Sequence, residues 1–306
     1  MKREQKDFEH FNKCPVCTSP SLASFKKSTF DFLRLSQDEI KITDSDYGKI
    51  WDLSRCQDCS HIFANPSPSP EFISTLYSEV EDPLYEEEAR GRSKSFIKIL
   101  NRLERIQPSR GTLFDVGAAT GILLNLARQR GWEVDGIETS SWAVKLAEQK
   151  YNIQLRQGSF EEIELKKNLY AAVTMIDFIE HTPRPFQALI KAHEMLSSDG
   201  ILVLVTPDVA SLAAKIAGQR WWHFRAGHLA FFNKRSLHAL LQRSSFQVIK
   251  ERKYAWTFSA YYLMSRKRWL RFLLKNPLLA SFWKKIQLKL ALGDSFEIYA
   301  RKEEKP

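Results

Sequence analysis

The four cysteines of the chain form two Cys-x-x-Cys pairs, Cys14–Cys17 and Cys56–Cys59. Zinc binds four thiolates tetrahedrally, and a Cys-x-x-Cys turn lets two sulfurs reach one ion. Because no cysteine is left over, the spacing predicts a structural zinc site, with no open coordination position, on a zinc-ribbon-like module. Four unrelated thiols, or a ribbon that has lost its metal, are the alternatives. His61 is close enough in sequence to replace a ligand, but we expect it at the surface.

A second set of residues has the types and spacing of a nucleoside pocket. Gly117 and Gly121 bracket a turn from an apolar strand into a helix, where a backbone without Cβ atoms can approach a ligand closely. Ala119 takes the middle position and the third glycine of the dinucleotide fingerprint is missing, so a ligand without a pyrophosphate is favoured. Glu138 ends the next strand, where an acid can accept both hydroxyls of a ribose.

The elements that position these residues alternate between short apolar strands and amphipathic helices. Strands are predicted over 112–116, 133–137, 153–156, 171–176 and 200–206, and helices over 121–130, 140–150 and 185–196. This alternation indicates βαβ units, whose parallel sheets bind ligands beyond the carboxyl ends of the strands. With two later strands over 246–252 and 295–301, the predicted fold class is α/β. We expect a Rossmann-like, mostly parallel seven-stranded sheet with helices on both faces, plus the small N-terminal zinc ribbon.

Five motifs give the chain a resemblance to the class I S-adenosylmethionine-dependent methyltransferases, especially the group that includes the quinone-biosynthesis O-methyltransferases. They lie at 115–121, 136–138, 176–181, 199–200 and 228–241, and the resemblance covers residues 85–306. Ala119 stands where the first motif of this group more often has glycine. An N-terminal module with two Cys-x-x-Cys pairs also recurs in the group, often in genes for saccharide or secondary-metabolite modification.

The resemblance implies S-adenosylmethionine as the cofactor, held at the ends of the first four strands. Ser159 and Phe160 follow the third strand, where a small polar residue and an aromatic ring suit an adenine. The expected cofactor-binding residues are Asp115, Gly117, Ala118, Ala119, Thr120, Gly121, Glu138, Thr139, Ser159, Phe160 and Asp177.

Methyl transfer requires an acceptor aligned with the sulfonium methyl group and a base for any proton that must leave. His181, just past the fourth strand, is the first candidate for a catalytic base, and His228 is the second. His181 could instead pack at the strand end and orient the cofactor loop. The resemblance also implies a divalent cation such as magnesium at Asp177, Glu180 and His181. Loop and helix-cap roles for the two acids are the alternative.

An aromatic segment and a basic insert follow the fifth predicted strand. Trp221, Trp222 and Phe224 either stack on an acceptor ring or pack in the core. Residues 252–293 hold ten Lys or Arg and no Asp or Glu, which equals the formal net charge of +10. A helical insert over about 254–292 is typical of peripheral membrane association and would suit a lipid-linked acceptor. A lid or an oligomer interface is the alternative, and nucleic acid is disfavoured.

These observations divide the chain into a zinc-ribbon-like module over 1–65, a linker over 66–84 and a methyltransferase domain over 85–306. The content of 43% apolar and 27% charged residues is that of a globular protein. Because the N-terminus lacks the apolar stretch of a secretory signal, we expect a cytoplasmic protein that contacts the inner membrane surface peripherally.

The expected reaction is transfer of a methyl group from S-adenosylmethionine to a small-molecule or lipid-linked acceptor, at a hydroxyl of a saccharide or quinone-like ring. An RNA methyltransferase that grips phosphates with its ribbon and insert is one alternative. A non-catalytic, cofactor-binding scaffold is the other.

Overall fold

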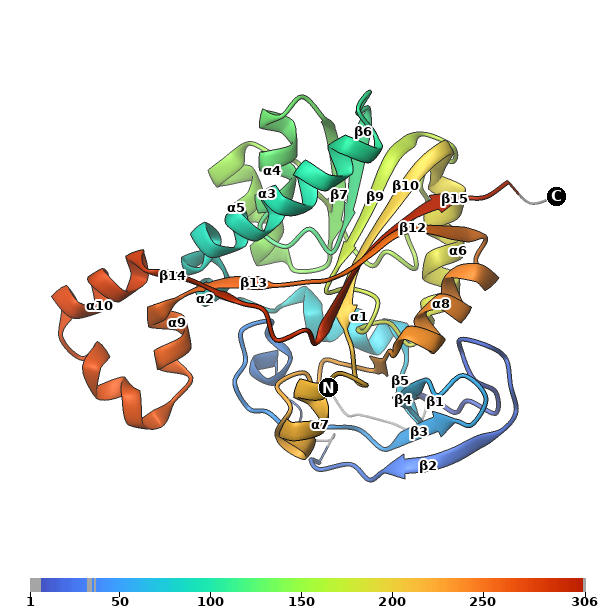
Figure 1. Ribbon diagram of the computed structural model, residues 1–306, viewed down its shortest axis with the longest axis horizontal. Coiled ribbons are helices and arrows are strands. Elements are labelled where there is room, and N and C mark those ends of the chain that lie inside the picture. The colour runs from blue at the N-terminus through green and yellow to red at the C-terminus, as the bar shows by residue number, and fades with distance from the viewer. Residues whose placement is uncertain (1–6, 32–34, 36, 305–306) are drawn as a thin grey trace.

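The fold is built on a sheet of seven strands in the order β12-β15-β10-β9-β6-β7-β8 (Figure 1). The computed structural model describes residues 7–31, 35 and 37–304. The strands are β6 (Thr112–Val116), β7 (Glu133–Glu138), β8 (Arg156–Gln157), β9 (Tyr170–Ile176), β10 (Leu196–Pro207), β12 (Phe246–Lys253) and β15 (Ser295–Lys302). β15 runs antiparallel to both of its neighbours, and the pairs from β10 to β8 are parallel. The predicted mostly parallel α/β sheet is confirmed.

Helices cover both faces of this sheet (Figure 1). One face carries α3 (Ala89–Ile106), α4 (Ile122–Gln129) and α5 (Ser141–Tyr151), and the other carries α6 (Pro185–Met195) and α8 (Lys234–Arg243). Strand β10 shows why both layers are needed. Its Ile201 and Val203 pack in the core under α3 and α4, while Leu202 and Leu204 pack in the core under α6 and α8. A strand that is apolar on both sides must be covered on both sides.

The third predicted strand differs most from the structure. It was expected over 153–156, but β8 contains only Arg156 and Gln157. The reason is that α5 ends with Asn152 in the left-handed conformation, and the amide of Ile153 still donates to the carbonyl of Ala147. That amide is therefore not free to join the sheet.

The N-terminal module shares its sheet and core with a later part of the chain. Its sheet contains β2 (Leu22–Lys26), β3 (Leu53–Cys56), β4 (Ile62–Ala64) and β11 (Ala230–Phe231). Trp51 packs in one core with Trp221 and Phe231, and its indole Nε1 donates to the carbonyl of Ala226 over 2.7 Å. The ribbon-like module is thus completed by residues far away in sequence. Residues 1–6, 32–34 and 36 of the predicted module lie outside the described residues.

The segment 66–84, expected as a linker, contains ordered elements. These are β5 (Ser67–Pro68), which pairs with β1 (Phe8–Glu9), then α1 (Pro70–Ser78) and the start of α2 (Pro83–Glu87). The hydroxyl of Ser69 accepts the amide of Phe72 over 3.2 Å, and Pro70 occupies the first helical turn, so both residues favour a helix start here. Helix α1 lies at the carboxyl edge of the sheet (Figure 1).

The basic insert forms an arm that extends away from the sheet, orange to red in Figure 1. Its elements are β13 (Trp256–Ser259), α9 (Ala260–Ser265), the 3-10 helix η5 (Arg268–Leu274), α10 (Pro277–Lys285) and β14 (Gln287–Leu290). The arm is therefore helical only between two antiparallel strands. Its base docks on α3, where a Cβ at Gly91 would collide with the carbonyl of Thr257. The buried carboxylate of Glu88 accepts the amide of Ser259 over 2.7 Å.

The outer surface of the arm is apolar as well as basic. Trp269, Phe272 and Leu278 are 71%, 63% and 81% exposed. In the part of the chain that the structure describes, no helix is both long and apolar enough to cross a membrane.

Candidate active site

The turn after β6 is shaped by left-handed backbone conformations. Gly117 has φ +70°, and Gly121, at the start of α4, has φ +76°. The amides of Gly117 and Ala118 both donate to the carbonyl of Ile137 over 3.0 Å, which fixes the turn against β7. The turn thus presents backbone at the carboxyl edge of the sheet.

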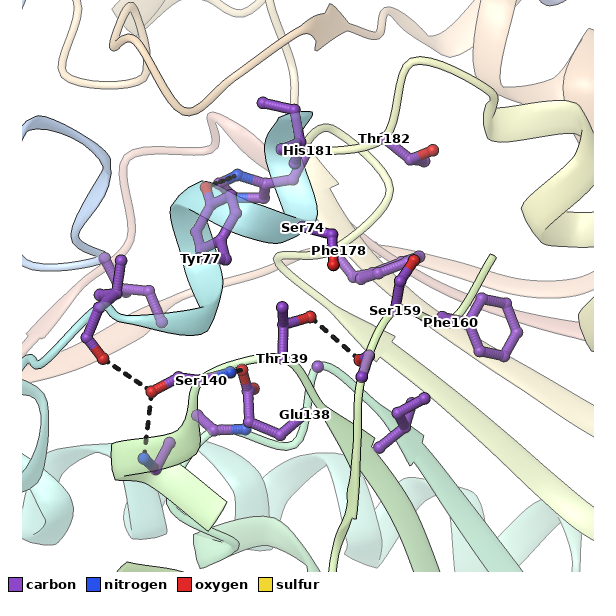
Figure 2. Close-up of a pocket in the computed structure, with 18 of the residues that line it drawn as sticks. Ser74, Tyr77, Glu138, Thr139, Ser140, Ser159, Phe160, Phe178, His181 and Thr182 are labelled. Atoms are coloured by element: carbon purple, nitrogen blue, oxygen red, sulfur yellow. Dashed lines mark hydrogen bonds between the residues drawn. The ribbon is translucent and has the colours of Figure 1, made fainter. Parts of the chain in front are cut away.

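Glu138, at the end of β7, is the best-fixed acid at this edge. Its two carboxylate oxygens accept the amides of Ala119 and Ser140, each over 2.8 Å. Burial raises the pKa of Glu138, while these amide hydrogen bonds oppose the rise. The carboxylate is held rigidly, and the side chain lines a cavity (Figure 2).

The first cavity lies between the glycine turn, α1 and the end of β9 (Figure 2). The predicted cofactor residues that line it are Gly117, Ala119, Thr120, Glu138, Thr139, Ser159, Phe160 and Asp177. The other three are placed differently. Asp115 and Ala118 line a small adjoining cavity, and Gly121 packs against Ala147.

His181 lies at the far end of the first cavity, in contact with α1. The hydroxyl of Tyr77 and the Nδ1 atom of His181 are 2.8 Å apart, as the dashed line in Figure 2 shows. Gly227 makes this contact possible, because a Cβ there would lie 2.8 Å from the hydroxyl oxygen of Tyr77. Burial lowers the pKa of His181 to about 4, and nearby Arg225 and His223 add to the effect. The imidazole is therefore neutral near pH 7, and it is a weaker base than a free histidine.

A second cavity meets the first at Asp177 and His181, and both residues line both cavities. Its walls include the predicted second base, His228, and three aromatic side chains of the arm, Trp256, Phe258 and Tyr262. Burial raises the pKa of Asp177 to about 7, against the opposing charges of Arg92 and Arg225. Ligands in the two cavities would therefore both lie beside Asp177 and His181.

A divalent cation is expected from the sequence at Asp177, Glu180 and His181, but the structure brings together a different group of possible ligands. Ligand atoms of Glu180, His181 and His228 lie within 4.8 Å of one another, and Asp177 is not in this group. One carboxylate and two imidazoles are a poor match for magnesium, which prefers oxygen ligands. Burial, and then the charge of Asp177, raises the pKa of Glu180 well above its usual value, so this carboxyl can hold a proton itself.

Three residues that sequence reasoning did not select take prominent places in the site. Tyr77 lies in the segment expected as a linker, and Arg92 lies on α3. Arg92 is 4% exposed, its guanidinium carbon lies 3.7 Å from the centre of the Tyr85 ring, and its Nε atom has no hydrogen-bond partner among the described residues. Arg225 donates to the backbone carbonyls of Ile42 and Asp44. No local motif marks these positions, although Arg225 belongs to the segment expected as the acceptor wall.

The aromatic residues of segment 221–224 were expected either to stack on an acceptor ring or to pack in the core, and the structure shows that they do not all lie in the same place. Trp221 and Phe224 are 0% and 5% exposed and pack in the core of the N-terminal module. Trp222 lines the second cavity. The core role therefore applies to two of the three rings.

The four cysteines lie together, as predicted. The Sγ atoms of Cys14 and Cys59 are 3.6 Å apart, those of Cys17 and Cys56 are 3.5 Å apart, and all four lie within 4.8 Å of one another. The expectation that His61 lies at the surface is wrong. Its ring is 0% exposed and stacks on Phe63 with ring centres 5.6 Å apart.

Comparison with known proteins identifies the fold that carries this site. A family model described as a methyltransferase domain matches residues 86–251, more than half of the chain. The chain belongs to the methyltransferase domain family. The prediction of a methyltransferase domain is confirmed.

Relatives of this methyltransferase are similar over part of its length. Ubiquinone biosynthesis O-methyltransferases from Saccharophagus degradans and Haemophilus ducreyi are each 29% identical, over 109 and 127 residues. These matches cover 34% and 36% of this chain, and 46% and 54% of the two relatives, so the chain spans about half the length of the curated relatives. A solved SAM-dependent methyltransferase from Archaeoglobus fulgidus is 21% identical, with a TM-score of 0.49, over 72% of this chain and 98% of that one.

The buried Asp115 of the methyltransferase domain should make folding stability depend on pH. Burial raises its pKa to about 7, and the carboxylate of Glu138 adds to the rise. In an unfolded chain an aspartate has a pKa of about 3.9. Between these values the folded protein holds a proton that the unfolded chain releases. The contribution of Asp115 is therefore fully present below about pH 4 and is lost as the pH rises through about 7.

We expect Asp115→Asn to remove this pH dependence. The free energy of unfolding of the variant, relative to wild type, should rise by about 2 kcal/mol between about pH 5 and about pH 8. Urea denaturation at the two pH values measures the change. Asp199→Asn, at an exposed position, is the matched control and should show no such rise. Equal pH dependence in the two variants would contradict the assignment.

Proposed function

We propose that the protein transfers a methyl group from S-adenosylmethionine to a hydroxyl of a small-molecule or lipid-linked acceptor, on a saccharide or quinone-like ring. The observation that carries the proposal is the meeting of two cavities at Asp177 and His181. The cofactor would occupy the first cavity and the acceptor the second. The ubiquinone O-methyltransferase relatives support a small-molecule hydroxyl as the acceptor.

The residues around the first cavity fit the nucleoside end of the cofactor. Glu138 has each carboxylate oxygen fixed by one amide, so the remaining lone pairs can accept the two ribose hydroxyls. Phe160 and Ile137 offer apolar surface for a flat ring, and no Cβ covers the backbone of Gly117 on the cavity side. The described residues that line the first cavity include no Lys or Arg that could bind a pyrophosphate. This agrees with a cofactor that has no pyrophosphate.

Arg92 fits the amino-acid end of the same cofactor. It lines the small cavity beside Gly117, Ala118 and Asp177, and none of the ion pairs found among the described residues involves it. A buried guanidinium without an anionic partner is costly, and the α-carboxylate of S-adenosylmethionine would supply one. We assign this carboxylate to Arg92.

The chain's own contribution to methyl transfer is alignment and the removal of a proton. When bound, S-adenosylmethionine supplies the methyl group as an electrophilic sulfonium. His181 is neutral near pH 7 and lies on the wall that faces both cavities, so it can take the acceptor's hydroxyl proton. When Nδ1–H of His181 donates to Tyr77, the lone pair of Nε2 is free for that proton. Tyr77 is therefore a positioning residue.

The reaction can be sought directly in metabolite and lipid-linked glycan pools. Cells with and without the gene should differ in one compound by the mass of a methylene group. With the acceptor in hand, we expect His181→Gln to lower turnover by about 10²–10⁴-fold and to leave the affinity for S-adenosylhomocysteine unchanged. His238→Gln, on the outer surface of α8, is the matched control and should behave as wild type. Full turnover in His181→Gln would exclude this histidine as the base.

We also propose that the four thiols hold one structural zinc ion. In a tetrahedral site with Zn–S bonds of about 2.3 Å, the sulfurs are about 3.8 Å apart, close to the separations found here. The two turns have the same backbone: Thr18 and Ser60, each directly after a pair, have φ +61°, and their amides donate to the carbonyls of Cys14 and Cys56. This geometry fits a metal without any rearrangement.

The purified protein should contain about one zinc per chain by elemental analysis. Cys59→Ser should lose the metal and lower the thermal midpoint, because a structural site contributes its binding free energy to folding. His61→Phe is the control and should retain zinc, since His61 is not part of the thiol cluster. Wild-type protein without zinc, with four freely titratable thiols, would refute the site.

We further propose that the arm binds an anionic lipid surface. Its exposed apolar side chains, Trp269, Phe272 and Leu278, occur on a segment that carries basic residues and no acid. Apolar insertion and attraction to anionic headgroups together are what an interfacial segment needs. The arm also lines the second cavity through Phe258 and Tyr262, which would place a lipid-linked acceptor beside its membrane.

Sedimentation with vesicles tests this binding. Wild type should sediment with vesicles that contain anionic lipid and far less with zwitterionic ones. The double variant Trp269→Ser, Leu278→Ser should remain in the supernatant. Leu212→Ser, Ile216→Ser is a matched control, because these side chains on α7 (Leu212–Ala217) are 72% and 78% exposed but lie outside the arm. Equal loss of sedimentation in both double variants, or sedimentation independent of lipid charge, would contradict the proposal.

A further inference from the structure

The second cavity has more cations on its walls than its acids can neutralise. The cations are Lys41, Arg92, Arg225, Arg266 and Lys267, and the acids are Glu39, Asp44, Asp177 and Asp294. Two of these groups have charged partners outside the cavity, since Lys49 pairs with Glu39 and Asp38 pairs with Lys41. Asp294 lies 3.5 Å from His223. Burial raises the pKa of Asp44, and it raises the pKa of Asp177 to about 7.

Within the described part of the chain, Arg266 and Arg225 are the two guanidiniums of this cavity that form no ion pair and have no assigned cofactor group. The Nε and Nη2 atoms of Arg266 are buried without a hydrogen-bond acceptor among residues 7–31, 35 and 37–304, and its guanidinium carbon lies 4.3 Å from the centre of the Tyr262 ring. Arg225 donates only to backbone carbonyls in the interactions found here, so its charge is oriented but not neutralised. Buried donors without acceptors are costly, and an anionic ligand would remove that cost.

The same cavity offers apolar and aromatic surface around these cations. Trp256, Phe258 and Tyr262 come from the arm, and Trp222 comes from the segment that follows α7. The arm supplies cations and rings but no acid, since residues 254–292 contain neither Asp nor Glu. A ligand that is anionic at one end and flat or apolar elsewhere matches these walls.

We propose that the methyl acceptor carries an anionic oxygen group, a carboxylate or a phosphate, which Arg225 and Arg266 bind while the acceptor body lies against the aromatic wall of the arm. This inference rests on the proposed function, because it assigns the second cavity to the acceptor. It goes further by defining the acceptor's charge. The anion would fix the acceptor with its hydroxyl towards His181, and a neutral ring would lack that anchor.

Binding of simple anions to protein saturated with S-adenosylhomocysteine tests the proposal. Saturation also supplies Arg92 with its own carboxylate. Phenyl phosphate, benzoate and neutral benzyl alcohol serve as probes, with affinities from calorimetry or ligand-observed NMR. At least one of the two anions should bind tenfold or more tightly than benzyl alcohol, and the tighter one distinguishes phosphate from carboxylate.

Variants locate the binding site of the anion. Arg266→Gln should weaken the preferred anion at least tenfold and leave the affinity for S-adenosylhomocysteine unchanged. Arg225→Gln should have the same effect. If Arg225→Gln fails to fold, Arg266→Gln alone tests the proposal. Arg252→Gln is the matched control, because Arg252 is exposed and lines neither cavity.

Three results would overturn the inference: no anion binding, equal affinity for anions and benzyl alcohol, or an unchanged anion affinity in Arg266→Gln. Failure of S-adenosylhomocysteine itself to bind would instead overturn the proposed function.

Discussion

The carboxyl ends of parallel strands lie at one edge of a sheet, and this constraint determines where chemistry can occur in the protein. The chain order reverses at β6, which has β7 on one side and β9 on the other. The connections after β6 and β9 therefore leave in opposite directions and open a crevice. Gly117, Glu138 and Asp177 follow three different strands, yet all line the cavity in that crevice. The amide of Ala119 reaches the carboxylate of Glu138 because β6 and β7 are neighbours.

The other half of the site depends on segments packed over that edge. The hydroxyl of Tyr77, on α1, contacts His181. The N-terminal module shares a core with the segment 221–231, which contains Arg225 and His228. A zinc ion in the thiol cluster would therefore stabilise the wall of the second cavity from a distance. The arm closes the opposite side, anchored on α3 through Glu88 and Ser259. The second cavity thus combines three parts of the chain that are far apart in sequence.

Sequence reasoning predicted what local patterns encode. Alternating apolar runs gave the sheet and its helices, and strand ends located Glu138 and Asp177. Local sequence patterns did not predict contacts between residues that are far apart in the chain. The contact between Tyr77 and His181 joins residues 104 positions apart, and nothing around Tyr77 distinguishes it from a surface tyrosine. The full burial of His61 depends on Phe232, which no spacing near the cysteines reveals. The strands of the arm were missed because its basic, aromatic composition resembles an interfacial helix.

The central claim is that the first cavity binds a nucleoside whose ribose is held by Glu138. Calorimetry of S-adenosylhomocysteine with wild type and Glu138→Gln tests it most directly. The account predicts saturable binding to wild type at one site per chain, and an affinity at least about tenfold lower in the variant, because a charge-assisted pair of hydrogen bonds is lost. No binding to wild type, or equal affinity in the two proteins, would contradict it.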